Sequence, residues 1–179
     1  MGVTASGVVS IEDYLSNPAY QHCEYVNGQP VKLNVGNQKH ARIQGRCFRR
    51  LDEYFDTKPG GYVGTELHCR LQISGETRFR LPDIAVAVHP RFSKDGYLEG
   101  APDLVVEIRS PDDSVSDQIR KIDDYFANGA KLAWLILPEE RSVLVLAPGS
   151  SPRTVVSGEN LSGDEVLPGL VFPADFLFS

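Results

Sequence analysis

Two acidic residues lie within aliphatic segments that alternate as β-strands do. Asp83 lies in residues 78–88, and Glu107 lies in residues 102–110. Successive side chains on a strand point to opposite faces, and a carboxylate buried among aliphatic side chains is costly unless it is paired, hydrogen-bonded or bound to a metal. If the two strands are neighbours, Asp83 and Glu107 form a cation site.

Two further charged residues share the predicted strand face of Glu107. Asp103 and Arg109 stand at even spacing from Glu107, which places all three side chains on one face. Asp103 is either a further ligand or a residue that caps the strand end, and we favour the cap. Arg109 remains protonated, so it suits a phosphate contact but not proton transfer. Alternatively, Arg109 forms a salt bridge to Glu107 that discourages metal binding.

A helix predicted for residues 115–128 follows the Glu107 strand directly. Asp117, Lys121 and Tyr125 recur every four residues, so they share one helix face. The simplest account makes Asp117 part of a capping box and Lys121 its exposed partner, in a pair worth about 0.3–0.5 kcal/mol. Because a helix that follows a strand starts near the strand's C-terminal end, Lys121 is also in a position to lean back toward Glu107.

An earlier helix, predicted for residues 38–55, carries a basic face separate from its apolar stripe. This basic face consists of Lys39, Arg42, Arg46, Arg49 and Arg50. Guanidinium groups match phosphate oxygens, so the face is a candidate contact for a DNA backbone; a solvated face that balances acidic neighbours is the alternative. His40, at the helix start, is assigned either to a phosphate or metal-bound water or to a hydrogen bond with a loop.

The remaining elements indicate a mixed α/β fold. Asn27-Gly28 predicts the turn of a hairpin in residues 24–33. Other strands are expected at residues 62–73, 132–137 and 142–147, which with the helices favour a mixed sheet flanked by helices. Glu66, in the first of these strands, is either a third site carboxylate or, as we favour, an exposed residue on an edge strand.

Length and composition predict one soluble domain. The chain has 179 residues, of which 41% are hydrophobic and 23% charged. We expect an N-terminal helix and hairpin at about residues 10–35, a core at about 38–148 and an extension at about 149–179. No segment suits a membrane span or signal peptide, and three cysteines without metal-ligand spacing indicate the cytoplasm. The net charge of −6 argues against broad, nonspecific nucleic-acid binding.

An ordered set of motifs resembles the Uma-type family of restriction-endonuclease-like proteins, within the PD-(D/E)xK nuclease superfamily. The resemblance extends from about residue 24 to residue 146. The matching motifs are Glu24-Tyr25-Val26-Asn27-Gly28, His40, Leu81-Pro82-Asp83, the segment of residues 100–111, and Asp117, Lys121, Tyr125, Gly129 and Trp134 at their spacing. Each fragment is weak alone, whereas the ordered set is fairly specific.

The resemblance implies a restriction-endonuclease-like core and a metal-dependent reaction. By this resemblance, Asp83 and Glu107 hold Mg²⁺ or Mn²⁺, and Lys121 orients or activates the attacking water. The superfamily's usual lysine position, two residues after the glutamate, is Arg109 here. The implied function is hydrolysis of DNA phosphodiester bonds by an endonuclease, with a homodimer suited to cutting two strands. The alternative is an inactive nucleic-acid-binding or protein-interaction module that retains the fold.

Overall fold

The computed structural model of the protein describes residues 7–34 and 36–179. Its helices are α1 (Ile11–Ser16), the 3₁₀ helix η1 (Pro18–Tyr20), α2 (Gln38–Asp56), α3 (Val115–Phe126) and α4 (Asp175–Phe178). Its strands are β1 (Cys23–Val26), β2 (Gln29–Lys32), β3 (Tyr62–Gly64), β4 (Cys69–Ile73), β5 (Glu76–Arg80), β6 (Ile84–Ala87), β7 (Leu98–Glu99), β8 (Leu104–Ile108), β9 (Leu132–Leu137), β10 (Ser142–Leu146), β11 (Arg153–Val155), β12 (Asn160–Ser162) and β13 (Val171–Pro173). Residues 1–6 of the predicted single domain and residue 35 of its N-terminal unit lie outside the described residues.

The larger sheet has six strands in the order β11-β10-β9-β8-β6-β3. β8 and β9 run parallel and are connected through α3, whereas β6 and β8 run antiparallel. The register pairs Ile84 with Val106, so Asp83, one residue before β6, lies opposite Glu107 near the end of β8. Strand pairing therefore brings the two predicted site carboxylates to adjacent positions.

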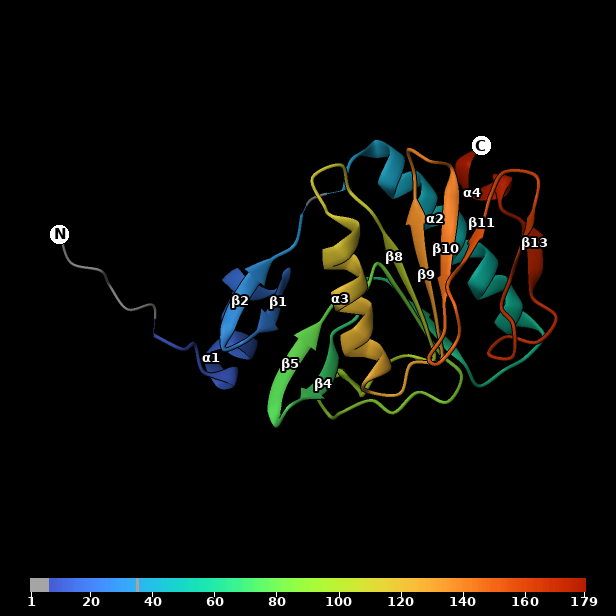
Figure 1. The fold of residues 1–179 in the computed structure, drawn as a ribbon. Coiled ribbons are helices and arrows are strands. Elements are labelled where there is room, and N and C mark those ends of the chain that lie inside the picture. The colour runs from blue at the N-terminus through green and yellow to red at the C-terminus, as the bar shows by residue number, and fades with distance from the viewer. Residues whose placement is uncertain (1–6, 35) are drawn as a thin grey trace.

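Helices α2 and α3 cover opposite faces of the larger sheet (Figure 1). Ile43 of α2 packs in a buried cluster with Val106, and Ile122 of α3 packs in another with Val105. Because side chains alternate along β8, Glu107 lies on the same face as Val105 and points toward α3. The predicted mixed fold of sheets and flanking helices is confirmed.

The smaller sheet has five strands in the order β2-β1-β5-β4-β7. Its β1–β2 hairpin turns at Asn27 and Gly28, with φ angles of 51° and 74°, the conformation that favours this residue pair. Tyr14 of α1 packs against Tyr25 and Phe79 of the sheet. The predicted hairpin is confirmed, and in Figure 1 it lies beside α3.

The strands predicted as continuous over residues 62–73 and 78–88 are wrong as single elements. Each divides between the two sheets, with β3 and β6 in the larger sheet and β4 and β5 in the smaller one. The first segment is interrupted near Glu66, whose φ of 48° is left-handed. The second is interrupted at Pro82, which has no N–H for a ladder hydrogen bond. The second break places Asp83 at the start of β6 rather than within a strand.

The residues after β11 cover the larger sheet on the side of α2. Leu161, Phe172 and Leu177 belong to the buried cluster that includes Ile43 of α2. Trp134 of β9 also belongs to this cluster, and its ring centroid lies 6.1 Å from that of Phe172. The C-terminal extension therefore completes the core on this side.

Candidate active site

Asp83 is held where β6 begins by contacts with two other elements. Its Oδ2 accepts a 2.6 Å hydrogen bond from the backbone N–H of Ile108, and its Oδ1 lies 3.2 Å from Nε2 of His40. Gly36 leaves space for His40, since a Cβ at Gly36 would come within 2.5 Å of Nδ1 of that imidazole. His40 thus contacts a predicted metal ligand, a partner that differs from both sequence alternatives, a phosphate or metal-bound water and a loop.

Glu107 and Lys121 form a buried ion pair between β8 and α3. Nζ of Lys121 lies 2.9 Å from Oε1 of Glu107 and 3.0 Å from Oε2, and its hydrogen bond goes to Oε2. Oε1 accepts no hydrogen bond within the described residues. The simpler expectation, that Lys121 pairs at the surface with Asp117, is wrong: Asp117 pairs with Arg120.

Glu24 of β1 is a third buried carboxylate at the same place. Its Oε1 lies 2.9 Å from Nζ of Lys121 and accepts a hydrogen bond from the backbone N–H of Leu81, while its Oε2 accepts a 2.6 Å hydrogen bond from Arg80. Arg80 also contacts Asp124 of α3 at 2.6 Å. The ion network therefore ties the hairpin, β5 and α3 together around Lys121.

Sequence reasoning used Glu24 as part of a family motif but did not include it among the site residues. The signal was available, since Glu24 lies between Cys23 and Tyr25 in a strand whose residues are largely buried. A buried strand carboxylate needs a partner, which is the argument that identified Glu107. The sequence analysis places Glu24 at the start of the hairpin of residues 24–33 and predicts no partner for it.

Burial and charge shift the pKa values of the two glutamates in opposite directions. Burial raises the pKa of Glu107 to about 8, and the nearby charges of Asp83 and Glu24 add to this effect against the pull of Lys121. Burial also acts on Glu24, but the charges of Lys121 and Arg80 outweigh it and lower the pKa of Glu24 below its ordinary value. Glu24 is thus the better-compensated anion of the two.

Two other site groups have raised pKa values. Burial opposes protonation of His40, yet its hydrogen bond to Asp83 and the charge of that carboxylate raise its pKa above the ordinary value of 6.5. Lys121 is likewise buried, and the charges of Glu107 and Glu24 raise its pKa. Lys121 is therefore a permanent cation at neutral pH.

A cleft of about 670 Å³ opens at this cluster, between the hairpin and the starts of α2 and α3. Asp83, Glu107, Lys121, Glu24 and His40 all line it. The residues described form no group of three or more His, Cys, Asp or Glu side chains arranged to hold a metal ion. Two carboxylates are nevertheless sufficient for Mg²⁺, which takes its other ligands from water and phosphate. Oε1 of Glu107, whose contact with a donor in the described residues is the 2.9 Å ion pair with Lys121, fits this role.

Three predicted accessory residues lie at or near the cleft. Glu66 is not on an edge strand as expected; it lies in the loop between β3 and β4, lines the cleft and stands 3.5 Å from Nδ1 of His22. Asp117 lines the cleft mouth and accepts a hydrogen bond within the capping box of α3. Tyr125 is fully buried, and its hydroxyl has no hydrogen-bond partner within the described residues.

Two other predicted residues have partners elsewhere. Asp103 accepts a hydrogen bond from the N–H of Val88 and pairs with Lys131 at 2.7 Å, which is the capping arrangement favoured from sequence. Arg109 lies 3.1 Å from Oε1 of Glu140 in the turn after β9, not against Glu107. In this structure Arg109 therefore leaves the carboxylate of Glu107 to Lys121.

The basic face of α2 lies on a different side of the helix from the cleft, which α2 lines with His40, Ala41 and Gln44. Arg46 donates a hydrogen bond to the carbonyl of Phe176, and Arg49 and Arg50 lie over that phenyl ring at 5.2 and 5.6 Å from its centroid. These contacts join the arginines to α4. Their role in nucleic-acid binding stays a prediction.

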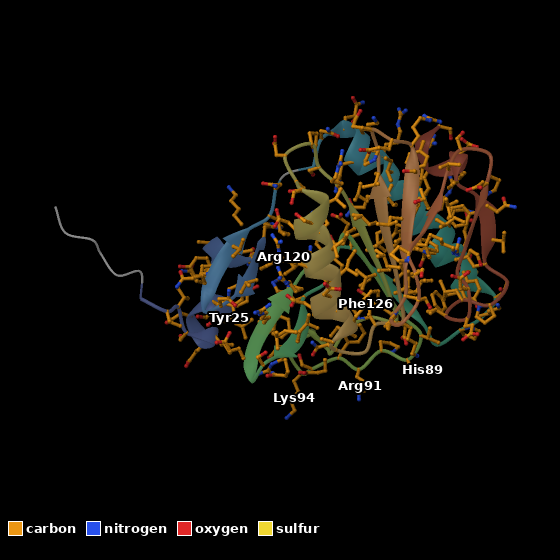
Figure 2. The ribbon with its side chains drawn as sticks, in the orientation of Figure 1. Tyr25, His89, Arg91, Lys94, Arg120 and Phe126 are labelled. Carbon is orange, nitrogen blue, oxygen red and sulfur yellow. The ribbon has the colours of Figure 1, made fainter. Side chains whose placement is uncertain are left out.

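The start of α2 lines a hollow that it shares with Leu177 and Phe178 of α4. Lys39 pairs with exposed Glu139 at 2.9 Å, and Lys39 and Arg42 line this hollow of about 390 Å³, which is separate from the cleft. Figure 2 labels His89, Arg91 and Lys94 below the C-terminal end of α3, where Phe126 is labelled. The cleft lies at the other end of α3.

A comparison with protein families matches most of the chain. A family model described as "Uma2: Putative restriction endonuclease" matches residues 11–175. The chain belongs to this family. Membership in the Uma2 family confirms the resemblance predicted from the motifs and makes this a restriction-endonuclease-like, nuclease-type protein.

A solved structure supports the same fold for this Uma2 protein. The chain is similar to the crystal structure of a "putative nuclease belonging to DUF820" from Anabaena variabilis ATCC 29413, with 23% sequence identity and a TM-score of 0.75. The match covers 87% of this chain and 89% of the other. No curated protein matches the chain.

In the part of the chain that the structure describes, no helix is long and apolar enough to cross a membrane.

Proposed function

We propose that this protein is an endonuclease that hydrolyses DNA phosphodiester bonds with Mg²⁺ or Mn²⁺ as its cofactor. The observation that carries the proposal is the convergence of Asp83, Glu107 and Lys121 at one cleft. The residue before β6, strand β8 and helix α3 supply these side chains, and each side chain is held by specific contacts. Membership in the Uma2 family supports the same reaction.

The chemical roles follow from the side chains. Asp83 and Glu107 would hold the metal ion, since hard oxygen ligands from one or two carboxylates suit Mg²⁺. Bound there, such an ion supplies charge stabilisation at the phosphoryl group and a more acidic water. Lys121 would orient that water and stabilise the negative charge that grows on the phosphate oxygens. His40 would fix the carboxylate of Asp83 through its Nε2.

DNA contacts are proposed for the basic face of α2, principally its first turn. Lys39 and Arg42 lie near the cleft end of the helix, whereas Arg46, Arg49 and Arg50 would have to give up their contacts with α4 to bind DNA.

A homodimer would place two sites on two strands. Light scattering at several protein concentrations tests this assembly: a mass of one chain throughout would contradict it.

A binding module without hydrolysis is the second candidate, and one observation favours it. The ammonium of Lys121 contacts Glu24, Glu107 and the carbonyl of Leu81, so its three N–H donors already have acceptors. A closed ion network is also what a purely structural cluster looks like. This candidate predicts salt-sensitive DNA binding that is independent of divalent metal.

Cleavage of supercoiled plasmid and of single-stranded circular DNA, with Mg²⁺ or Mn²⁺, separates the two candidates. Wild type should cut, and Asp83→Asn should lower the rate by about a hundredfold or more, because electrostatic stabilisation at a reacting centre has that magnitude. Asp103→Asn is the matched control, since this carboxylate lies outside the cleft and should leave cutting unchanged. Cutting that persists in Asp83→Asn would sink the nuclease proposal.

A further inference from the structure

Glu24 reaches the candidate site from the smaller sheet, outside the strands that carry the two proposed metal ligands. Its side chain is only 5% exposed. Oε1 accepts a 3.1 Å hydrogen bond from the N–H of Leu81 and lies 2.9 Å from Nζ of Lys121. Oε2 accepts from Arg80, which is itself anchored on Asp124. Both oxygens of Glu24 therefore have donors, and contacts with Leu81, Arg80 and Lys121 fix the position of the carboxylate.

Glu107 and Glu24 differ in the donors that surround their carboxylates. The same ammonium lies between the two carboxylates at matching distances of 2.9 Å. Within the described residues Lys121 is the only donor that contacts Glu107, at 2.9 and 3.0 Å from its two oxygens, whereas Glu24 also accepts hydrogen bonds from Leu81 and Arg80. One ammonium carries one positive charge, so it neutralises one of the two carboxylates. The donors around Glu24 favour it as the counter-ion of Lys121.

This division of charge has a consequence for the proposed nuclease. If Lys121 had only Glu107 as its partner, the ammonium and a divalent cation would compete for the same carboxylate. With Glu24 present, the ammonium keeps an anionic partner when Glu107 binds the cation. The arrangement would keep a cationic side chain beside a metal ligand while that ligand holds the cation.

We propose that Glu24 is a positioning residue that serves as the dedicated counter-ion of Lys121 and thereby frees Glu107 for the divalent cation. This inference rests on the proposed function and adds a residue that acts through Lys121 rather than on the metal. Arg80 and Asp124 support it by fixing the carboxylate of Glu24. Glu24 is not itself a metal ligand in this account.

The test is a double-mutant cycle read by calorimetric titration of Mn²⁺ without DNA. Glu24→Gln should weaken Mn²⁺ binding about tenfold more when Lys121 is present than in a Lys121→Met background, because only the ammonium can compete for Glu107. The Met background also corrects for the general loss of one nearby negative charge. Glu139→Gln, which removes an exposed carboxylate paired with Lys39, is the matched control and should leave the Mn²⁺ affinity unchanged.

A second variant keeps the proposal falsifiable if Glu24→Gln does not fold, as judged by circular dichroism. Lys121→Met alone should bind Mn²⁺ at least as tightly as wild type, since the competing cation is gone. Weaker binding in Lys121→Met, or an equal loss from Glu24→Gln in both backgrounds, would overturn the role of Glu24 while leaving the nuclease proposal intact. Wild type that binds no Mn²⁺ and cuts no DNA would overturn both.

Discussion

The two charged regions predicted from the sequence, the cleft cluster and the basic face of α2, differ in what surrounds their charges. In the cleft cluster, Glu24, Glu107 and Lys121 have side chains no more than 12% exposed and pair with one another across three elements. On α2, Arg49 is 62% exposed and Lys39 is 47% exposed. Buried charges need mutual compensation, whereas exposed charges are already solvated. We therefore propose the cleft cluster as the site of the chemistry and the basic face as an adjustable contact surface.

The largest predicted difference concerns stability. Arg80→Met should lower the free energy of unfolding by about 3–5 kcal/mol, because it leaves Glu24 and Asp124 buried with fewer cationic partners. Arg49→Met, the counterpart on the basic face, should cost about 1 kcal/mol or less, since its pair with Glu53 is exposed. Urea unfolding at neutral pH measures both. Equal losses would remove the distinction between the regions.

The second prediction uses the opposite pKa shifts of the two glutamates. The folded-state pKa of Glu24 lies below the ordinary 4.5, so its stabilisation is present above about pH 4.5 and is lost as the pH falls through the folded value. Glu107 has a pKa raised to about 8, so its contribution is present below about pH 4.5 and is lost as the pH rises toward 8.

Wild type should therefore lose stability relative to Glu24→Gln on acidification, and relative to Glu107→Gln when the pH rises from about 5 to about 9. Unfolding curves of the three proteins across this range provide the measurement. The matched Gln substitutions keep side-chain size nearly constant. The same trend in both variants would mean that the two carboxylates share their charge equally, against the assignment of Glu24 as the counter-ion.

The smallest predicted effect concerns DNA affinity at the basic face. Replacing Lys39 and Arg42 together with Ala should weaken binding severalfold and reduce the slope of log affinity against log salt by about 2, close to 0.9 for each phosphate contact. Fluorescence anisotropy with chelator present, over a range of salt, gives this slope. Arg46→Ala should change the slope less, because its guanidinium is held at Phe176. An unchanged slope in the double variant would exclude the first turn of α2 from DNA binding.

Sequence patterns were sufficient for the elements whose signals are local. The N-terminal helix, the Asn27-Gly28 turn and the two longer helices are set by nearby residues, and all are confirmed. The face of Glu107 was also predictable, because alternation along one strand depends only on that strand. The division into a single domain with its three parts stays a prediction.

Contacts between residues that are distant along the chain were harder to predict from the sequence. Alternation continues through Pro82, so it could not reveal that one apparent strand leaves the smaller sheet and enters the larger one. The partners of Arg109 and Glu24 depend on which segments meet in space, and no spacing along the chain encodes the contact of Glu24 with Lys121, which lies on a distant helix. The adjacency of Asp83 and Glu107 was therefore predictable, but the network that holds Lys121 was not.

The central claim is that Asp83 and Glu107 jointly hold a divalent cation in the cleft. Anomalous diffraction from crystals soaked in Mn²⁺ tests it most directly. Wild type should give a peak about 2.0–2.6 Å from carboxylate oxygens of both residues, with Lys121 still beside Glu24. Glu107→Gln should give no peak there. A wild-type cleft without a peak, or a peak at other residues, would contradict the account.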